Sequence, residues 1–427
     1  MKAFVLLNED ESFFYFFINL NGGIIVVSIE EQIKIIGKGA AEIIEASELK
    51  GKLEQACKEG RPLKIKLGLD PTAPDLHLGH GVVLRKIRQM QELGHGAIII
   101  LGDFTGRIGD PSGKSKTRKQ LSTEEVLENA RTYKEQLYKI LLPEKTTVLF
   151  NSEWLSKLSF EDVLKLAAKT TVARIMERDD FKNRFRQNAS IGLHELFYPL
   201  MQAYDSVEIK ADIEMGGTDQ RFNILMGREL QRHFGQESQI ALFMPILEGV
   251  DGVEKMSKSL GNSIGIHEPP AVMFEKVMSI PDALIIRFFN LCTDLHPDQV
   301  SVFQKRLDSG ENPRQVKLEL AHEIVRLYHG EALAQEAEAY FDRVFKEKGI
   351  PEKIPSLRML PFCDEGGLTD LIKVMVTMGF APSSSEARRL IDQGGVKLEG
   401  IRVESFKVKI REGQVLQVGK KNFVKLL

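Results

Sequence analysis

Two short apolar runs separated by one helix-length segment constrain the fold of this chain more than any other feature. Leu63–Leu69 has the length of a strand, residues 79–93 have the pattern of a helix that Gly94 ends, and residues 97–101 read Ala-Ile-Ile-Ile-Leu. Strands joined through a helix run parallel, and an entirely apolar strand needs cover on both faces. The pattern therefore predicts a βαβ unit in a parallel sheet of the Rossmann type.

Around this unit the chain alternates between helical stretches and short strands. Ser28–Gly60 predicts a helix with an interruption near its middle, and residues 120–200 are largely helical in pattern. Val148–Phe150 and Ile240–Leu247 predict two further strands. The first 265 residues therefore suit one α/β domain with a long helical segment inside it.

The rest of the chain predicts separate domains. A chain of 427 residues exceeds one hydrophobic core, so two or three domains are expected. Residues 270–348 are helical throughout, and three prolines between 351 and 361 mark a linker. The residues after Gly367 predict two short helices followed by small strands.

The composition is that of an ordinary soluble protein without a metal or disulfide framework. Hydrophobic residues make up 43% and charged residues 28% of the chain, and the formal net charge is −2. Cys57, Cys292 and Cys363 lie far apart and form no CxxC pair. This spacing predicts neither a zinc site nor disulfides, and it is typical of a reducing cytoplasm.

The N-terminal residues fall outside the pattern of the rest. Two apolar runs, 13–18 and 24–27, follow an acidic stretch, whereas a signal peptide begins with basic residues. A polar break leaves each run far shorter than the ~20 residues that cross a bilayer. We expect no targeting or membrane segment. We expect residues 1–26 to be a dispensable extension or a product of start-site choice, with the working protein beginning near Val27 or Ser28.

The first candidate site lies where the first strand gives way to its helix. Residues 70–80 read Asp-Pro-Thr-Ala-Pro-Asp-Leu-His-Leu-Gly-His. Ligands of open parallel sheets bind at this end of the strands, and a helix N-terminus offers free N–H groups that suit phosphate. His77 and His80 can face one anion, and Gly79 lets a planar base approach the backbone. Taken alone, the histidines could equally be structural, and a metal site would lack a third ligand.

A second motif is a glycine-flanked basic loop. Residues 255–259 read Lys-Met-Ser-Lys-Ser between Gly252 and Gly261, which indicates a mobile loop that can grip a triphosphate. Alone, such a loop is usually solvated charge. Together, residues 77–80 and 255–259 resemble the HIGH and KMSKS signatures of class I aminoacyl-tRNA synthetases, in the same order. The resemblance implies that both histidines and both lysines bind ATP phosphates and stabilise the transition state.

A third motif, Gly109–Ser115, superficially suggests a P-loop. Its glycines are separated by three residues where a Walker A motif needs four, so we reject that interpretation. The segment resembles instead the GDPSG stretch of tyrosyl-tRNA synthetases. The resemblance implies that Asp110 binds the α-ammonium group of tyrosine and that Lys114 and Arg118 help to position pyrophosphate.

A fourth motif concerns the choice of amino acid. Tyr198, Gln202 and Asp205 recur at intervals of four and three, so they can line one face of a helix. By itself this pattern would describe a helix that packs on the sheet. It is similar, however, to the tyrosine-binding helix of tyrosyl-tRNA synthetases. The similarity implies that Tyr198 and Gln202 contact the substrate ammonium and that Asp205 accepts a hydrogen bond from the substrate hydroxyl.

Two further positions extend or depart from the resemblance. Residues 216–220 read Gly-Gly-Thr-Asp-Gln, which implies that Asp219 binds the adenosine ribose and that Gln220 lies near the substrate carboxylate. Many members of the family carry a Tyr before the first motif that also contacts the substrate hydroxyl. This chain has Lys66 there, as some bacterial members do, so the source of a second hydroxyl contact is left open.

The C-terminal part is basic. From Leu368 to Leu427 there are eleven Lys or Arg and six Asp or Glu, a local charge of +5 that suits RNA phosphates. Solvated charge alone would explain such a balance about as well. Residues 384–400 resemble an S4 RNA-binding domain, which ends many bacterial tyrosyl-tRNA synthetases. The resemblance implies that RNA is contacted by Arg388, Arg389, Lys397 and Arg402.

The resemblance covers Ser28 to Leu427 and implies a set of domains. We expect an extension at 1–27, a class I catalytic Rossmann domain at 28–265 with a helical dimer segment at about 120–200, an α-helical anticodon-side domain at 266–350, a linker at 351–366, and a small α+β S4 domain at 367–427.

The function that the resemblance implies is that of a tyrosine–tRNA ligase. L-Tyrosine and ATP, with Mg²⁺, would give tyrosyl-adenylate and pyrophosphate, and tyrosyl would pass to the 3′-terminal adenosine of tRNA(Tyr). A cytoplasmic homodimer without zinc or a prosthetic group is expected. The implied catalytic residues are His77, His80, Lys255, Lys258, Thr72, Lys114 and Arg118. The implied ATP-binding residues are Asp70, Gly79, His77, His80, Asp219 and Lys258.

Two other functions compete with this one. A tryptophanyl-tRNA synthetase has the same fold and chemistry, but Asp205 and the S4-like tail argue against it. A non-catalytic RNA-binding protein on the same scaffold should have lost some signature positions, and none of His77, His80, Lys255 or Lys258 is missing.

Overall fold

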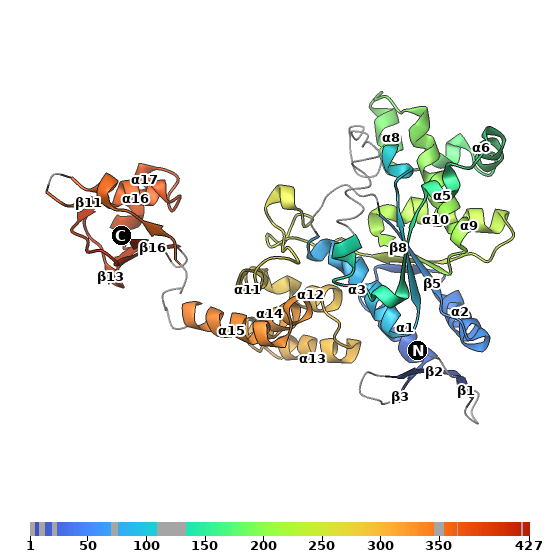
Figure 1. Ribbon diagram of the computed structural model, residues 1–427, viewed down its shortest axis with the longest axis horizontal. Coiled ribbons are helices and arrows are strands. Elements are labelled where there is room, and N and C mark those ends of the chain that lie inside the picture. Colours follow the sequence, from blue (N-terminus) through green and yellow to red (C-terminus); the bar gives the residue numbers. More distant parts are fainter. Residues whose placement is uncertain are drawn as a thin grey trace. The chain divides into compact units, whose positions relative to one another are not determined.

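The computed structural model divides the chain into two compact units, Met1–Ala334 and Gln335–Leu427 (Figure 1). The first unit contains the large central sheet, and the second contains the small C-terminal sheets. The structure describes residues 5–7, 13–18, 24–69, 76–108, 134–345, 354–364, 366–419 and 422–427.

The first unit is built on a six-stranded sheet in the order β4-β9-β8-β5-β6-β7. Its strands are β4 (Glu42–Ile44), β5 (Lys64–Leu69), β6 (Gly96–Leu101), β7 (Thr146–Phe150), β8 (Ile213–Gly217) and β9 (Ile240–Met244). All neighbours are parallel except β4, which pairs antiparallel with β9 at the edge. The strand order changes direction between β5 and β8, and ligands of open α/β sheets bind at the carboxyl ends of strands at such a point.

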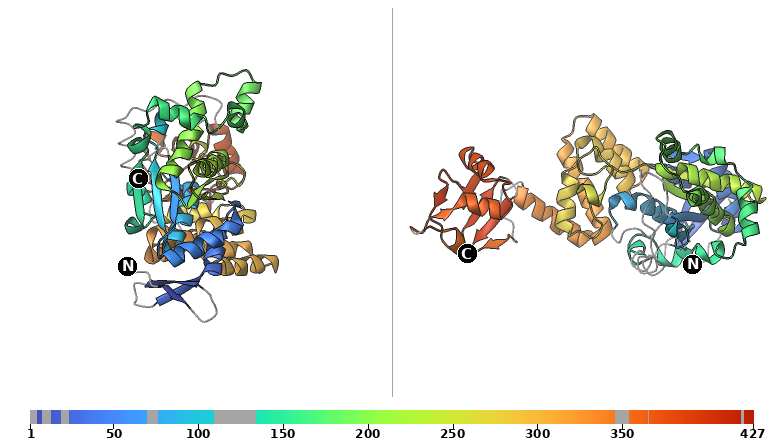
Figure 2. Two further views of the ribbon diagram at one scale, coloured as in Figure 1. Left: turned by 90° about the vertical axis from the view of Figure 1, so that its right-hand side faces the viewer. Right: turned by 90° about the horizontal axis from the view of Figure 1, so that it is seen from above.

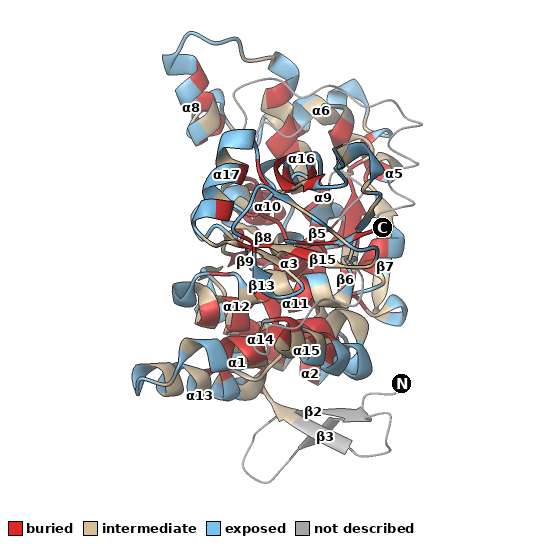
Figure 3. Cartoon of the chain, turned by 90° about the vertical axis from the view of Figure 1, so that its left-hand side faces the viewer, coloured by how far each residue is buried: buried red, intermediate tan, exposed pale blue. Residues whose placement is uncertain are grey.

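Helices cover both faces of this sheet. α3 (Leu78–Glu92) packs against β6 and β8, and α10 (Arg221–His233) packs against β8 and β9. The crossovers from β5 to β6 and from β8 to β9 run in opposite directions, so right-handed connections place their helices on opposite faces. This double cover explains why all five residues of β9 are buried. Figure 2 shows the sheet among its helices, and Figure 3 colours the buried residues of these elements red.

A group of helices follows the sheet. α14 (Pro313–His329) packs against α11 (Pro270–Met278), α12 (Ile285–Cys292) and α13 (Pro297–Asp308). α12 also packs against α3, where Arg85 forms an ion pair with Asp294. Buried Lys38 donates to the carbonyls of Thr293 at 2.8 Å and Leu295 at 2.6 Å. Arg85 thus fastens α3, and Lys38 fastens the end of α1, to the segment that follows α12. α15 (Glu331–Phe345) contains the division between the two units.

The beginning of the chain differs from the sequence-based expectation. β1 (Val5–Leu7), β2 (Phe13–Ile18) and β3 (Ile24–Ser28) form an antiparallel sheet, and the hydroxyl of Ser28 caps α1 (Ile29–Gly37). The helix expected over 28–60 is confirmed at α1 and α2 (Ala46–Glu59), and its expected interruption contains β4, a strand that was not predicted. Gly39 adopts a φ of 69°, and a Cβ there would lie 3.1 Å from the carbonyl oxygen of Asn290. The turn is therefore fixed by tertiary packing.

The described part of the predicted helical segment is helical. α5 (Ser152–Leu155), α6 (Phe160–Ala167), α7 (Val172–Ile175) and α8 (Asp179–Arg186) precede α9 (Tyr198–Ile209). α9 packs along α10, so its remaining face is directed toward the sheet ends.

The second unit has the predicted two helices followed by small strands. α16 (Leu371–Thr377) and α17 (Ser384–Asp392) pack on a sheet in the order β10-β16-β15-β12-β13, with a two-stranded pair β11–β14 beside it. The strands are β10 (Ser356–Leu357), β11 (Thr369–Asp370), β12 (Val396–Leu398), β13 (Ile401–Arg402), β14 (Lys407–Val408), β15 (Val415–Val418) and β16 (Asn422–Leu426). A Rossmann-type sheet with a group of helices and a small α+β C-terminal domain is thus confirmed, and two strands of that sheet, β8 and the antiparallel edge strand β4, were not predicted.

Candidate active site

A cavity of about 770 Å³ opens at the carboxyl ends of β5 and β8. Its wall is formed by the start of α3, one face of α9, the turn after β8 and the loop that follows β9. The predicted site residues that line it are His77, Gly79, His80, Tyr198, Gln202, Asp205, Asp219, Gln220, Lys255 and Lys258. The fold therefore brings together motifs that are far apart in the sequence.

His77 and His80 lie side by side at the N-terminus of α3, with ring centroids 3.9 Å apart. Nδ1 of His77 accepts from the Gly79 N–H at 3.1 Å, and Nδ1 of His80 accepts from the His77 N–H at 3.4 Å. Burial, followed by the nearby positive charges, lowers the pKa of His77 to about 3 and that of His80 to about 4. Both rings are neutral at pH 7, and each has its Nε2–H free to donate to an anion.

The loop after β9 is anchored by Met256, which lies between the two lysines of the motif. Met256 is buried, and its N–H donates to the carbonyl of Leu247 at 2.9 Å. A Cβ at Gly79 would lie 3.5 Å from the Cβ of Met256, so the two signature motifs contact each other. Lys255 and Lys258 flank this anchor, remain exposed and line the cavity.

Asp205 forms the deepest polar part of the wall. Its carboxylate accepts from Nε1 of Trp154 at 2.8 Å and from Nδ2 of Asn151 at 3.4 Å. Burial raises the pKa of Asp205 to about 7, although the charge of Lys66 and these two hydrogen bonds oppose the shift. A buried acceptor of this kind suits a ligand that brings one hydrogen-bond donor, such as a phenol.

The turn after β8 needs glycine for steric reasons. A Cβ at Gly216 would lie 2.7 Å from Cδ1 of Ile224, and one at Gly217 would lie 2.3 Å from the carboxylate of Asp219. This tight turn directs Asp219 and Gln220 to the cavity, where Gln220 accepts from Nδ2 of Asn223 at 3.0 Å.

Lys66 lies beneath the cavity and is no part of its lining. Its side chain is 0% exposed, and Nζ donates to the carbonyl of Gln202 at 2.9 Å and the hydroxyl of Ser206 at 2.6 Å. It also forms an ion pair of 2.8 Å with Glu214, its partner on the adjacent strand. These three partners use all three protons of the ammonium group. Lys66 therefore joins β5 to α9 and β8.

Five predicted site residues lie outside the described residues, so their positions stay predictions. They are Asp70, Thr72, Asp110, Lys114 and Arg118.

Three residues around Asp205 were not predicted: Asn151 and Thr105, which line the cavity, and Trp154. Asn151 donates to both Asp205 and Thr105, and Trp154 donates to Asp205. Asn151 directly follows the predicted strand at Val148–Phe150, and carboxyl ends of strands are where site residues gather. That position could have drawn attention to Asn151, whereas nothing in the sequence links Trp154 to a carboxylate 51 residues away.

The four predicted RNA-binding residues all lie in the second unit. Arg388 and Arg389 are exposed on α17, and Lys397 of β12 is the ladder partner of Arg402 of β13. Arg389 pairs with Glu386 at 2.6 Å, and Arg402 donates to the carbonyl of Asp392 at 3.1 Å. Two of the four predicted residues, Arg389 and Arg402, are thus held in place by contacts within the unit.

Metal and membrane features are absent from the described parts of the chain. No three His, Cys, Asp or Glu side chains there lie close enough together to hold a metal ion. No helix among the same residues is long and apolar enough to cross a bilayer.

Comparison with known proteins agrees with this geometry. The family described as tRNA synthetases class I (W and Y) matches residues 58–346, and the S4 domain family matches residues 371–416. The tyrosine–tRNA ligase 2 of Clostridium acetobutylicum is 59% identical over 402 residues, which cover 94% of this chain and 99% of that protein. The tyrosine–tRNA ligase of Moorella thermoacetica is 55% identical over 401 residues, which cover 93% of this chain and 96% of that protein.

A solved structure supports the same assignment. The tyrosyl-tRNA synthetase of Archaeoglobus fulgidus, determined with L-tyrosine, superimposes with a TM-score of 0.58 at 25% identity and covers 73% of this chain and 99% of its own. The sequence matches extend over nearly the whole length of the bacterial relatives, and the matched region contains the cavity and both signature motifs. The chain therefore belongs to the class I tRNA synthetases for tryptophan and tyrosine, and within them to the tyrosine–tRNA ligases.

Proposed function

We propose that this chain activates L-tyrosine with ATP and then transfers the tyrosyl group to the 3′-terminal adenosine of tRNA(Tyr). One observation carries the proposal. A single cavity is lined by the two neutral histidines, by the two lysines of the loop, and by a helix face that ends in the buried carboxylate of Asp205. Its volume of about 770 Å³ is enough for an amino acid together with a nucleotide.

In the first step a carboxylate oxygen of tyrosine attacks the α-phosphorus of ATP, and the bond to the bridging oxygen breaks as pyrophosphate leaves. The attacking carboxylate is already ionised at pH 7, so no general base is needed. Alignment and stabilisation of negative charge are what the reaction requires. His77 and His80 donate neutral N–H groups, Lys255 and Lys258 add positive charge, and Thr72, Lys114 and Arg118 take the same role from outside the described residues. The nucleotide enters as its Mg²⁺ complex, held mainly by phosphate and water.

The α9 face selects the amino acid. Asp205 accepts the phenol hydrogen of the substrate, while Tyr198, Gln202 and Asp110 hold its ammonium group and Gln220 lies near its carboxylate. Asp219 binds the ribose, and Asp70 and Gly79 border the nucleotide. A phenylalanine side chain would leave the buried Asp205 carboxylate without this donor, which is unfavourable.

In the second step a ribose hydroxyl of the terminal tRNA adenosine attacks the adenylate carbonyl and releases AMP. We assign tRNA contacts to the S4 domain at 367–427 through Arg388, Arg389, Lys397 and Arg402. Lys397 and Arg402 share one ladder position, so they present adjacent positive charges to a phosphate backbone. In the chain, the helical domain at 266–350 and the linker at 351–366 connect the catalytic domain at 28–265 to the S4 domain.

The working form is a cytoplasmic homodimer joined through the helical segment before α9. Apolar side chains that a monomer would bury are exposed on this segment: Phe160 at 78%, Leu164 at 55%, Val172 at 65%, Phe185 at 69% and Leu193 at 73%. A surface with this many large apolar groups is typical of an interface between subunits.

The proposal is tested by ATP–pyrophosphate exchange without tRNA, run in parallel with tyrosine, phenylalanine and tryptophan. Exchange with tyrosine alone is expected. Exchange with tryptophan would move the substrate assignment to the sister enzymes, and no exchange with any of the three would favour a non-catalytic RNA-binding protein.

A further inference from the structure

The loop that carries Lys255 and Lys258 is folded around one buried amide. Asn262 is only 3% exposed, although the residues from Lys258 to Gly261 are all exposed. It does not line the cavity, so it is not placed to contact a bound nucleotide. A buried amide in an otherwise exposed loop must have its hydrogen-bonding groups satisfied from within the loop.

The side chain of Asn262 satisfies both of its ends. Oδ1 accepts from the Ser257 N–H at 2.8 Å, between the two lysines of the motif. Nδ2 donates to Oδ2 of Asp251 at 2.6 Å and lies 3.2 Å from the carbonyl oxygen of Lys255. Asp251 in turn accepts from the backbone N–H groups of Val253 at 3.0 Å and Glu254 at 3.1 Å. The amide thus connects the start of the loop with the part that faces the cavity.

The backbone of the loop packs closely against the Asn262 side chain. A Cβ at Gly249 would lie 2.3 Å from Cγ and Nδ2 of Asn262, so the backbone at 249 closes directly over the side chain. The backbone carbonyl of Asn262 also accepts from the Val250 N–H at 3.0 Å. Glycine at 249 and an amide at 262 therefore act as one packed unit.

Asn262 also stands next to the segment that holds the first signature motif. Two residues on, the carbonyl of Ile264 accepts from the Leu78 N–H at 2.9 Å, and Gly265 forms a β-bridge with His77. The chain from 262 to 265 therefore joins the lysine loop to the helix start that carries the histidines.

We propose that Asn262 is a positioning residue for ATP, which fixes Lys255 and Lys258 in register with His77 and His80 through its contacts to Ser257 and Asp251. The inference rests on the proposed function, because it assigns the four groups to the same triphosphate. It gives Asn262 no contact with the substrate.

The test uses two single variants and their combination in the full-length protein. Asn262→Asp keeps the acceptor for Ser257 but places a second carboxylate against Asp251. Asp251→Asn removes the acceptor for Nδ2. In the combination Asp251→Asn/Asn262→Asp the amide and the carboxylate exchange places, which restores the acceptor for the Ser257 N–H and the hydrogen bond between residues 251 and 262 but not the contact with the Lys255 carbonyl. Steady-state pyrophosphate exchange gives kcat and KM for ATP, and calorimetry gives the Kd for tyrosine.

Asn262→Asp is expected to lower kcat/KM for ATP about 100-fold, as a small misplacement of reacting groups does, with the Kd for tyrosine unchanged. The exchanged pair should recover part of this loss, because the bond between residues 251 and 262 returns while the contact with the Lys255 carbonyl does not. Val253→Asp is the matched control, because it adds the same charge to the same loop at a side chain that is 79% exposed. It should change kcat/KM by less than about threefold.

Three results would overturn the inference: an Asn262→Asp protein with unchanged kinetics for ATP, an exchanged pair that recovers nothing, or a Val253→Asp protein as impaired as Asn262→Asp. Asn262→Ser is the second variant if the aspartate fails to fold, with the same expected loss for ATP and the same unchanged Kd for tyrosine. A wild-type protein without tyrosine-dependent exchange would instead refute the proposed function itself.

Discussion

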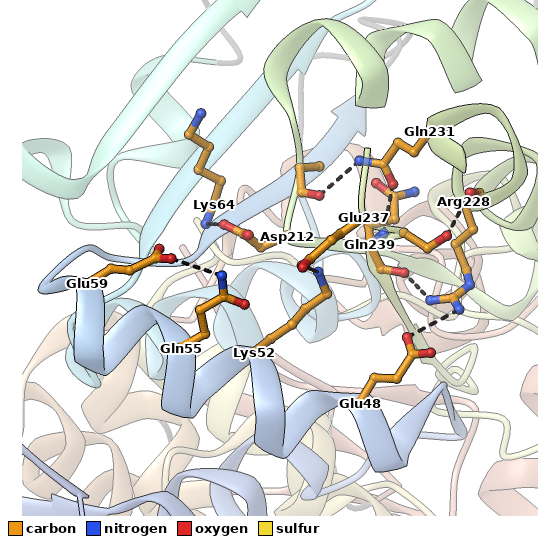
Figure 4. A network of polar contacts seen from close by, with 12 residues as sticks. Glu48, Lys52, Gln55, Glu59, Lys64, Asp212, Arg228, Gln231, Glu237 and Gln239 are labelled. Carbon is orange, nitrogen blue, oxygen red and sulfur yellow. Dashed lines mark hydrogen bonds and ion pairs between the residues drawn. The ribbon is translucent and has the colours of Figure 1, made fainter. Parts of the chain in front are cut away.

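The two ends of the central sheet differ in how their polar groups are used. At the amino ends of β5, β8 and β9, side chains pair with each other and with the backbone (Figure 4). Asp212 accepts from the Lys64 N–H at 2.8 Å and from Arg61 at 2.9 Å, and Lys52 pairs with Glu237 at 3.3 Å. These contacts fasten α2 and α10 to the strands and involve no cavity residue.

The polar groups at the carboxyl ends of the strands have a different role. There, burial and like charges move the pKa values of His77, His80 and Asp205 away from their ordinary range. These groups are held in states that are less favourable for the empty protein and more useful to a ligand. The amino ends of the strands therefore stabilise the fold, whereas the carboxyl ends give up some stability for binding and chemistry.

The largest expected effect is at the carboxyl end. His80→Ala should lower kcat for tyrosyl-adenylate formation by about 10²–10³-fold, because one N–H donor to the developing charge is removed. The midpoint of thermal unfolding should change little, since His80 lines the cavity and accepts one long hydrogen bond, from the His77 N–H at 3.4 Å. Pyrophosphate exchange and a thermal melt check both statements. A variant that is destabilised but keeps a normal kcat would show that His80 stabilises the fold, as the polar groups at the amino ends do.

Asp205→Asn should lower kcat/KM for tyrosine by about 10–100-fold, because the phenol loses a charged acceptor. Activity toward phenylalanine is the internal control and should change little.

Asp205→Asn should also change how stability depends on pH. The difference in free energy of unfolding between the variant and the wild type should shift in favour of the variant as pH rises from about 4 to 7. In the folded protein the pKa of Asp205 is raised to about 7, so the wild type loses stability over this interval and the variant does not. Denaturant unfolding at several pH values would reveal a variant that behaves otherwise.

Asp212→Ala, at the amino end, should reverse the pattern. Loss of the acceptor for the Lys64 N–H and for Arg61 should reduce the free energy of unfolding by about 1–3 kcal/mol. The kinetic constants of the folded protein should stay within about twofold of the wild type. A marked rise in KM for tyrosine would show that the two ends are coupled, and the comparison would fail.

The smallest expected effect is the pH dependence of tyrosine binding in the wild type. Because the pKa of Asp205 is about 7, its ionised fraction falls as pH drops from 8 to 6, and KM for tyrosine should rise by about tenfold. The histidines stay neutral over this range, since their pKa values are about 3 and 4. Asp205→Asn should abolish the dependence and Asp212→Ala should keep it. A pH-independent KM in the wild type would contradict the role given to Asp205.

The sequence predicted local features well and long-range partnerships poorly. The alternation of apolar strands and helices located β5, α3, β6, β7 and β9, and the motif residues of the described parts meet in one cavity. β4 was missed because its three residues become a strand only through pairing with β9. Lys66 was aligned with a substrate contact because periodicity alone cannot show that Glu214 occupies the facing position of the next strand.

The indole of Trp154 has a practical consequence, because it is the one tryptophan of the chain. Its N–H is bonded to the carboxylate of Asp205 at 2.8 Å, and the side chain is largely buried. The intrinsic tryptophan emission of the whole protein therefore originates beside the group that is proposed to recognise the phenol. Binding of a substrate, or protonation of that carboxylate, would alter this emission. The tryptophan fluorescence of the unlabelled protein therefore reports whether the cavity is occupied.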